Sequence, residues 1–251
     1  MVTPARPGSS LRFGRDDKGR LGLHPRVEEG MPPMLTLHAF ANMFPGGIGE
    51  TKDMRVQWAL EEMGLPYQVR AWDYLGGELE RPEFAELSPF RQLPALEHDG
   101  LVLSESAAIL IHLAESSGRL TPPDPHGREH VRQWCFAAMA TVAPTLSMTA
   151  MYDAGFLGAD GKARDFLTGL ARRWLGGVEQ RLQGQEWLLG DDFTVADLCL
   201  AGVLREARDN ELMDDFPAVR SLHDRAHARP AWRRTLDLTA RRMGVDRATL
   251  G

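Results

Sequence analysis

The sequence predicts an α/β domain followed by an all-helical domain. Residues 34–73 read as strand, helix and strand, the pattern of a βαβ unit with a parallel strand pair. Asp99-Gly100 stands between two short apolar runs and is a strong signal for a two-residue hairpin turn. Beyond residue 127 the regular segments have helical spacing, and none is a convincing strand. The expected divisions are residues 34–116, a linker at 117–127, and residues 128–251.

The composition is ordinary for a globular protein. Of 251 residues, 43% are hydrophobic and 25% are charged, and the formal net charge is −6. The negative charge argues against a surface that follows phosphates, so we expect no nucleic acid partner. We expect no membrane partner either, because no apolar run reaches membrane-spanning length and the longest candidates contain Glu or His.

Two cysteines, Cys135 and Cys199, stand far apart in segments predicted to be helical. This arrangement is neither a disulfide framework nor a metal site, and it fits a reducing cytosol, so we expect a cytoplasmic protein. The eight histidines form no cluster with ligand spacing, and no metal is inferred.

Residues 1–33 differ from the rest of the chain. They are rich in proline, glycine and charge, and no apolar periodicity persists in them. They lack the hydrophobic core of a secretory signal peptide and are more acidic than a mitochondrial leader. We expect a disordered extension, with folding beginning near Met34.

The first domain opens with an alternating strand at residues 35–40. After a loop, residues 52–63 carry an apolar helical stripe, and Gly64 ends the helix. Residues 66–73 form the second strand. The glycine-rich loop lacks the lysine and hydroxyl of a P-loop and the full dinucleotide pattern, so nucleotide binding is not indicated.

Pro94 opens a strand that should lie inside a sheet, where a missing backbone donor is costly. A cis Leu93–Pro94 bond would turn the backbone of Leu93 outward toward a ligand. Only about 5–6% of X–Pro bonds in folded proteins are cis, and nothing local favours that form. The residues alone therefore favour a trans bond.

Glu105 and Ser106 stand at the start of the following helix. Free N–H groups and the positive end of the helix dipole attract an anion there, and Glu105 has the charge to hold an ammonium. One anion site beside one cation site suits the head group of an α-amino acid. The alternative is purely structural, because Ser104 followed by polar residues would cap this helix in any case.

The second domain is predicted to contain helices at residues 128–154 and 163–183, separated by a break at 155–162. Thr194 followed three residues later by Asp197 is a capping-box arrangement ahead of an apolar run. We expect this box to satisfy free backbone donors at a buried helix start.

Residues 89–96 (PFRQLPAL) and 103–109 (LSESAAI) together resemble the glutathione-binding half of cytosolic glutathione transferases. The capping box resembles the one in the helical half of the same family. The resemblance covers roughly residues 34–238. It implies a thioredoxin-like N-terminal domain, a C-terminal helical bundle domain, and glutathione as co-substrate.

The resemblance also implies roles for individual residues. It implies that Pro94 is cis and that the backbone of Leu93 pairs with the cysteinyl part of glutathione. It implies that Glu105 and Ser106 bind the γ-glutamyl end. Arg91 is expected to meet the glycyl carboxylate.

The family keeps its thiol-activating Tyr, Ser or Cys in the loop that enters the first helix. This chain has none of the three between residues 34 and 67. What remains is Thr51, with Asn42 as an alternative donor and His38 on the strand, although Thr51 would also make a good N-cap. The missing cysteine excludes a mixed-disulfide oxidoreductase or a deglutathionylating enzyme, because either would need a thiolate at this position.

The predicted reaction is attack of the glutathione thiolate on a hydrophobic electrophile, in a protein expected to be a homodimer. Three alternatives stay open: a glutathione-dependent isomerase or dehalogenase of the same fold, a non-catalytic binding module, and a small-molecule carrier. The residues considered for the electrophile pocket, each of which is otherwise a core residue, are Trp134, Met139, Met148, Met151 and Tyr152.

Overall fold

The computed structural model describes residues 14–15, 21–22, 35–158, 161–207 and 211–250. In the N-terminal segment, β1 (Gly14–Arg15) and β2 (Leu21–Gly22) pair as two short antiparallel strands. Apart from these strands, the extension predicted to be disordered lies outside the described residues.

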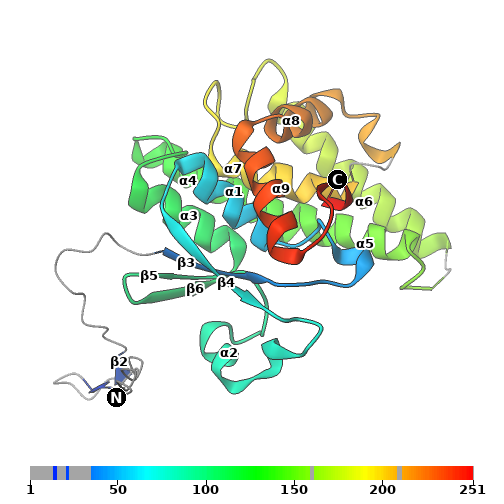
Figure 1. Cartoon of the computed structure of the whole chain (residues 1–251). Coiled ribbons are helices and arrows are strands. Elements are labelled where there is room, and N and C mark those ends of the chain that lie inside the picture. Colours follow the sequence, from blue (N-terminus) through cyan, green and yellow to red (C-terminus); the bar gives the residue numbers. More distant parts are fainter. Residues whose placement is uncertain (1–13, 16–20, 23–34, 159–160, 208–210, 251) are drawn as a thin grey trace, which may run out of the picture.

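A four-stranded sheet in the order β4-β3-β5-β6 is the centre of the first domain (Figure 1). Parallel pairing of β3 (Leu35–Phe40) with β4 (Tyr67–Trp72) confirms the predicted βαβ unit. β5 (Ala95–His98) runs antiparallel to β3 and to β6 (Leu101–Ser104). The hairpin turns through Asp99-Gly100, where both residues have positive φ (49° and 80°), as this pair predicts.

Helices lie on both sides of this sheet (Figure 1). α1 (Asp53–Met63) and α3 (Ser106–Ser117) lie on the side that faces the second domain. The opposite side carries α2 (Pro82–Leu87), a short helix that the sequence did not predict. Phe84 of α2 packs edge-on against Trp72, with ring centroids 4.8 Å apart, in a small apolar cluster of its own. The result is the thioredoxin-like domain that the resemblance implied.

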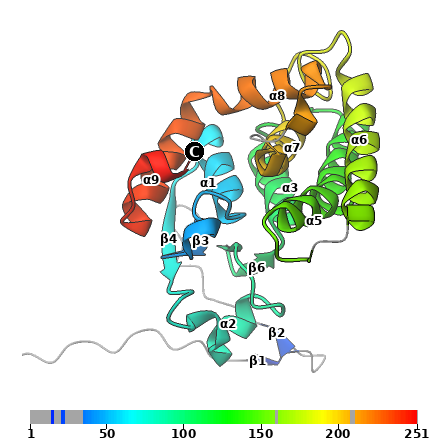
Figure 2. The same cartoon turned by 90° about the vertical axis from the view of Figure 1, so that its right-hand side faces the viewer.

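The second domain is built of helices (Figure 2). After α3, one helix runs from Pro125 to Asp153 with a π-helical segment in its middle. The sequence predicted nearly the same span, and the domain boundaries themselves stay a prediction. The helices are α4 (Pro125–Phe136), the π-helical segment η3 (Ala137–Val142), α5 (Ala143–Asp153), α6 (Gly161–Leu182), α7 (Val195–Leu204), α8 (Pro217–His227) and α9 (Pro230–Met243).

The helix Pro125–Asp153 is long and apolar enough, by length and composition, to cross a membrane. The expectation that no segment reaches this length was therefore wrong, because it considered uninterrupted apolar runs rather than the mean hydropathy of an 18-residue window, which reaches 1.3 within this helix. Val131, Val142 and Leu146 of this helix are buried in the main hydrophobic core. Packing within the domain thus accounts for one apolar face of the helix.

α7 is the central helix of the second domain, and all its residues are buried. Its start has the predicted capping box, in which the N–H and the hydroxyl of Thr194 donate to Asp197 Oδ2 at 2.9 and 2.8 Å. The N–H of Leu188 donates to Oδ1 at 2.7 Å. Burial raises the pKa of Asp197, whereas these hydrogen bonds favour the ionised carboxylate and oppose that rise.

α1 joins the two domains, because its buried polar side chains find partners in α9. Arg242 donates to Asp53 Oδ2 (2.8 Å), to Gln57 Oε1 (2.5 Å) and to the carbonyl oxygen of Phe40 (3.0 Å). Asp53 and Gln57 are no more than 2% exposed. A charge buried to this degree needs such a partner, so the first domain depends on the second for its stability.

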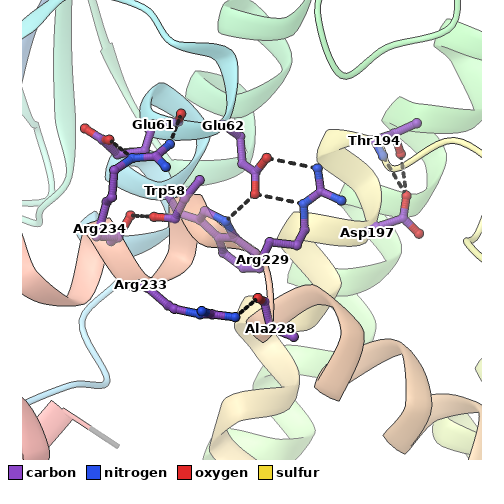
Figure 3. A network of polar contacts seen from close by, with 11 residues as sticks. Trp58, Glu61, Glu62, Thr194, Asp197, Ala228, Arg229, Arg233 and Arg234 are labelled. Carbon is purple, nitrogen blue, oxygen red and sulfur yellow. Dashed lines mark hydrogen bonds and ion pairs between the residues drawn. The ribbon is translucent and has the colours of Figure 1, made fainter.

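A second set of contacts closes the other end of α1 (Figure 3). Glu62 accepts from Arg229 Nε (2.8 Å) and Nη2 (3.0 Å), and also from the indole N–H of Trp58 (3.1 Å). Arg234 of α9 donates to Glu61 Oε2 at 2.9 Å. Both ends of α1 are therefore held by arginines of the helical domain.

Replacing Arg242 by Met tests this dependence. The substitution leaves the Asp53 carboxylate buried without its cation, and we expect the free energy of unfolding to fall by about 3–5 kcal/mol. Chemical denaturation measures the change. The matched control is Arg241→Met, since Arg241 is exposed on the same helix, and its effect should stay within about 0.5 kcal/mol. Equal effects of the two substitutions would contradict this account.

Candidate functional site

Two predicted residue pairs meet at one end of the β5–β6 hairpin. The first residue of β5 lies opposite the last residue of β6. Leu93-Pro94 comes directly before β5, and Glu105-Ser106 comes directly after β6, so both pairs lie at the same end of the ladder. The Leu93–Pro94 bond is cis, as the resemblance implied.

The start of α3 combines an uncommon backbone conformation with a buried hydroxyl group. Glu105 has a φ of 72°, which is uncommon for a residue with a side chain and typical of functional sites. No side chain caps α3, so the structural alternative of a cap at Ser104 is not what forms. The hydroxyl of Ser106 is buried and, among the described residues, has no hydrogen-bond partner. Leaving such a group unpaired costs about 1–3 kcal/mol, which a bound anion at this helix start would offset.

A cavity of about 1210 Å³ adjoins this end of the sheet, between the two domains. Its walls come from the loop before α1, from residues 90–93, and from α5 and the chain after α7. Leu93 and Arg91 line the cavity, whereas Pro94, Glu105 and Ser106 lie outside its lining. The predicted peptide-binding residues therefore extend from the cavity wall onto the neighbouring helix start.

Thr51 lies in the cavity wall just before α1. It is 8% exposed, and its hydroxyl oxygen is buried with no hydrogen-bond partner in the described part of the chain. The N-cap position of α1 is occupied by Lys52, and no side chain caps the helix. The alternative role of Thr51 as a capping residue is thus not realised, and its hydroxyl remains available as a donor.

Asn42 and His38, the other two candidates, are engaged in structural contacts. Asn42 donates to Asp73 Oδ1 (2.7 Å) and accepts from the N–H of Leu75 (3.1 Å), and it does not line the cavity. The hydrogen bond from Asn42 lowers the pKa of Asp73. Asp73 and Leu75 thus hold both ends of the Asn42 amide outside the lining of the cavity.

His38 is fully buried between two partners. The indole N–H of Trp72 donates to His38 Nδ1 at 2.9 Å, and an indole cannot accept, so the imidazole proton is on Nε2. Nε2 then donates to Glu97 at 2.7 Å. Burial lowers the pKa of His38, and its role in the structure is to join three strands of the sheet.

Arg91 lines the cavity but is already paired. Its guanidinium donates to the carbonyl oxygen and the carboxylate of Glu80, at 2.7 and 2.5 Å. The pair is at least 40% exposed, and exposed ion pairs are worth less than about 1 kcal/mol. Little free energy is therefore needed for Arg91 to exchange Glu80 for another carboxylate.

The helical wall of the cavity is more charged than the sequence suggested. Of the five residues considered for an apolar pocket, Met151 lines the cavity, while Trp134 and Met139 pack against the core. Glu206 lies in this wall, where it pairs with Arg55 at 3.5 Å and accepts from the hydroxyl of Ser147. These charges were missed because they come from segments far apart in the sequence, and no local motif marks them.

The two cysteines are far apart in the sequence but lie close together in the core. Cys135 of α4 and Cys199 of α7 are both buried and free. The contact with Cys199 and burial raise the pKa of Cys135 well above its ordinary value. Neither thiol lines the cavity. Across the described residues, no group of three or more His, Cys, Asp or Glu side chains is placed to hold a metal ion.

Comparison with known proteins places this geometry in a family. Residues 46–115 match the model of the glutathione S-transferase N-terminal domain, and residues 148–233 match that of the C-terminal domain. The disulfide-bond oxidoreductase YfcG of Escherichia coli is 31% identical over 68% of this chain and 84% of its own. A probable maleylacetoacetate isomerase of Drosophila melanogaster is 27% identical over 71% of this chain and 80% of its own.

A solved structure agrees with these matches. The crystal structure of a glutathione transferase from Burkholderia graminis aligns with a TM-score of 0.72 and 33% identity. The alignment covers 84% of this chain and 90% of that one. That structure holds two glutathione molecules per protein subunit.

The buried imidazole of His38 gives a prediction on pH. Because burial lowers its pKa in the folded protein, the unfolded chain binds more protons below its ordinary pKa of about 6.5. The free energy of unfolding should therefore fall as the pH drops from about 7 to about 5.5. His38→Gln keeps one donor and one acceptor but does not titrate, so denaturation curves should show a weaker pH dependence. His130→Gln, at an exposed position, serves as the control. An unchanged slope in His38→Gln would refute the assignment.

Proposed function

Because the chain belongs to the glutathione S-transferase family, we propose that it binds glutathione and transfers it, as the thiolate, to a hydrophobic electrophile. Relatives named as an oxidoreductase, an isomerase and a transferase have sequence identities to this chain of 31%, 27% and 26%. The cavity supports the proposal, as do the buried hydroxyls of Thr51 and Ser106, which have no hydrogen-bond partner among the described residues.

Four residues hold the tripeptide in this proposal. Glu105 binds the α-ammonium of the γ-glutamyl group, and the free N–H groups and hydroxyl at Ser106 bind its carboxylate. The backbone of Leu93 pairs with the cysteinyl part. Arg91 leaves Glu80 for the glycyl carboxylate. This arrangement directs the sulfur into the cavity wall that contains Thr51.

The single observation that carries the catalytic part is the buried hydroxyl of Thr51, which has no hydrogen-bond partner within the described ranges. A free cysteine thiol has a pKa of about 8.5, so little of it is ionised at neutral pH. A hydroxyl that donates to sulfur, together with the positive end of α1, favours the thiolate. Each unit of pKa depression corresponds to about 1.4 kcal/mol. Thr51 then takes the role for which the family otherwise uses Tyr, Ser or Cys.

The electrophile occupies the rest of the cavity. Phe40, Met43, Phe44 and Met151 give it apolar surface next to Thr51. Holding the electrophile against a fixed thiolate supplies the advantage of proximity. Homodimer formation and a cytosolic location stay predictions.

Two substitutions separate binding from activation. Ser106→Ala should weaken glutathione binding about tenfold, because it removes one buried hydrogen bond to the γ-glutamyl group. Thr51→Val should leave binding within about twofold but lower kcat with a chlorinated aromatic substrate about tenfold, because the bound thiol then has a higher pKa. Calorimetry measures the first effect, and steady-state rates over a range of pH measure the second.

Thr141→Val is the matched control, since Thr141 is an exposed threonine of the helical domain. A protein that fails to bind glutathione would be the non-catalytic module instead. Wild-type turnover and thiol pKa in Thr51→Val would remove Thr51 from the mechanism.

A second candidate function is glutathione-dependent reduction of a disulfide, which the 31% identity to a disulfide-bond oxidoreductase favours. The thiolate of one glutathione attacks the disulfide, forms a mixed disulfide and releases one thiol. A second glutathione attacks that mixed disulfide, so oxidised glutathione forms and the second thiol leaves. Both electrons come from glutathione, and no protein thiol takes part.

Incubation with glutathione and a small disulfide decides between the candidates. Disulfide reduction yields one oxidised glutathione per disulfide consumed, measured with glutathione reductase, whereas transfer yields a thioether from the chlorinated aromatic. If reduction occurs, the double variant Cys135→Ser, Cys199→Ser should retain its rate, because both thiols are buried away from the cavity. Loss of the rate in a folded double variant would show that a protein thiol is needed.

A further inference from the structure

A buried arginine joins the loop that carries Thr51 to the C-terminal turn of the chain. Arg205, directly after α7, donates from Nη2 to the carbonyl oxygen of Gly49 (3.1 Å) and to that of Leu250 (2.6 Å). It is only 6% exposed. The loop and the turn are about 200 residues apart in the sequence, and one guanidinium nitrogen connects their backbones.

The turn lies directly against the loop. It is the 3-10 helix η6 (Arg247–Leu250), and Leu250 has no exposed surface. Gly49 has a φ of 87°, and a Cβ atom there would lie 2.8 Å from the carbonyl oxygen of Leu250. Only glycine permits both this backbone conformation and this approach.

The guanidinium of Arg205 is itself held in place. It stacks over the ring of Trp232 in α9, 4.8 Å from the centroid, and it lies 3.6 Å from Glu50. The enclosed void between this group and the loop has a volume of about 10 Å³ and is lined by Thr51 among others. Such a void has room for about one water molecule at most, so the loop packs closely against the guanidinium.

We propose that Arg205 is a positioning residue for thiol activation and that the C-terminal turn is a structural part of the active-site loop. Thr51 follows Gly49 by two residues, so the contacts that fix Gly49 also fix the hydroxyl proposed to face the sulfur. The part of this inference that concerns the thiol rests on the proposed function. The part that concerns the loop does not.

The residues proposed to bind the γ-glutamyl group of glutathione lie outside the contacts of Arg205. Glu105 and Ser106 belong to the hairpin and α3, and neither takes part in the contacts of Arg205 with Gly49, Leu250 and Trp232. Loss of Arg205 should therefore change kcat and the thiol pKa but leave glutathione binding unchanged.

Two full-length variants test the inference from opposite sides. Arg205→Met removes the joining group, and Leu250→Asp displaces the buried turn while keeping Arg205. The amides of Gly47 and Glu50 donate within the loop, to the carbonyl oxygens of Phe44 and Gly47, so their hydrogen exchange measures the order of the loop. We expect exchange at both amides to become about tenfold faster in each variant.

The second measurement is the pKa of bound glutathione, followed by the ultraviolet absorbance of its thiolate. We expect a rise of about one unit and a tenfold fall in kcat below that pKa, with KM for glutathione within about twofold. Arg205→Lys keeps the charge but cannot reach both carbonyl oxygens, so it should restore only part of the effect. The controls are Arg220→Met, an arginine whose partner Asp214 lies on the surface, and Arg247→Ala, within the turn but paired at the surface with Asp237.

Each outcome has a distinct meaning. If the Gly47 and Glu50 amides of a folded Arg205→Met or Leu250→Asp protein exchange hydrogen as slowly as in the wild type, the inference is overturned. This holds whether or not the wild-type protein binds glutathione. If amide exchange in the loop is faster but the pKa of the bound glutathione thiol is unchanged, Arg205 is not a positioning residue for thiol activation. The C-terminal turn would still be a structural part of the loop. A wild type that does not bind glutathione defeats the proposed function, while the exchange result still decides the loop. If Arg205→Met does not fold, Leu250→Asp decides alone.

Discussion

The buried polar face of α1 is the constraint on which the structure depends. Asp53, Arg55 and Gln57 are each no more than 4% exposed, although they belong to the first domain's own helix. Removing such charges from water costs several kcal/mol each unless partners replace the solvent. The partners are Arg242 and Glu206, both in the helical domain. Separating the two domains would break these ion pairs, so the contacts of α1 couple the first domain to the second.

The same packing accounts for where the site's unpaired groups occur. Some buried hydroxyls have backbone partners, as Thr235 does with the carbonyl oxygen of Ala231. Thr51 lies just before α1 and Ser106 opens α3, and in the part of the chain that the structure describes their hydroxyls have no such partner. One of these hydroxyls lies in the cavity wall and the other at a neighbouring helix start, an arrangement that suits a polar ligand.

Local sequence signals predicted what local physics decides. Asp99-Gly100 specified the hairpin because both residues accept positive φ, and Thr194 with Asp197 specified a buried helix start. Contacts between distant segments left no such signal. The proximity of Cys135 to Cys199, the charged wall at Glu206, and the link from Arg205 to the C-terminal turn depend on how α7 packs, which no periodicity reveals. The short helix α2 was missed because its six residues are too few to show an amphipathic stripe.

The absence of a cysteine in the loop before α1 excludes fewer types of reaction than the sequence alone suggests. It removes any route through a protein thiolate in the loop before α1, and Cys135 and Cys199 are buried away from the cavity. A disulfide can still be reduced when glutathione supplies both thiols, provided that the site accommodates more than one molecule. The cavity, at about 1210 Å³, exceeds the roughly 300–1,000 Å³ usual for a pocket that holds one small ligand. Transfer to carbon and transfer to sulfur thus need the same activated thiolate, and what occupies the remainder of the cavity decides between them.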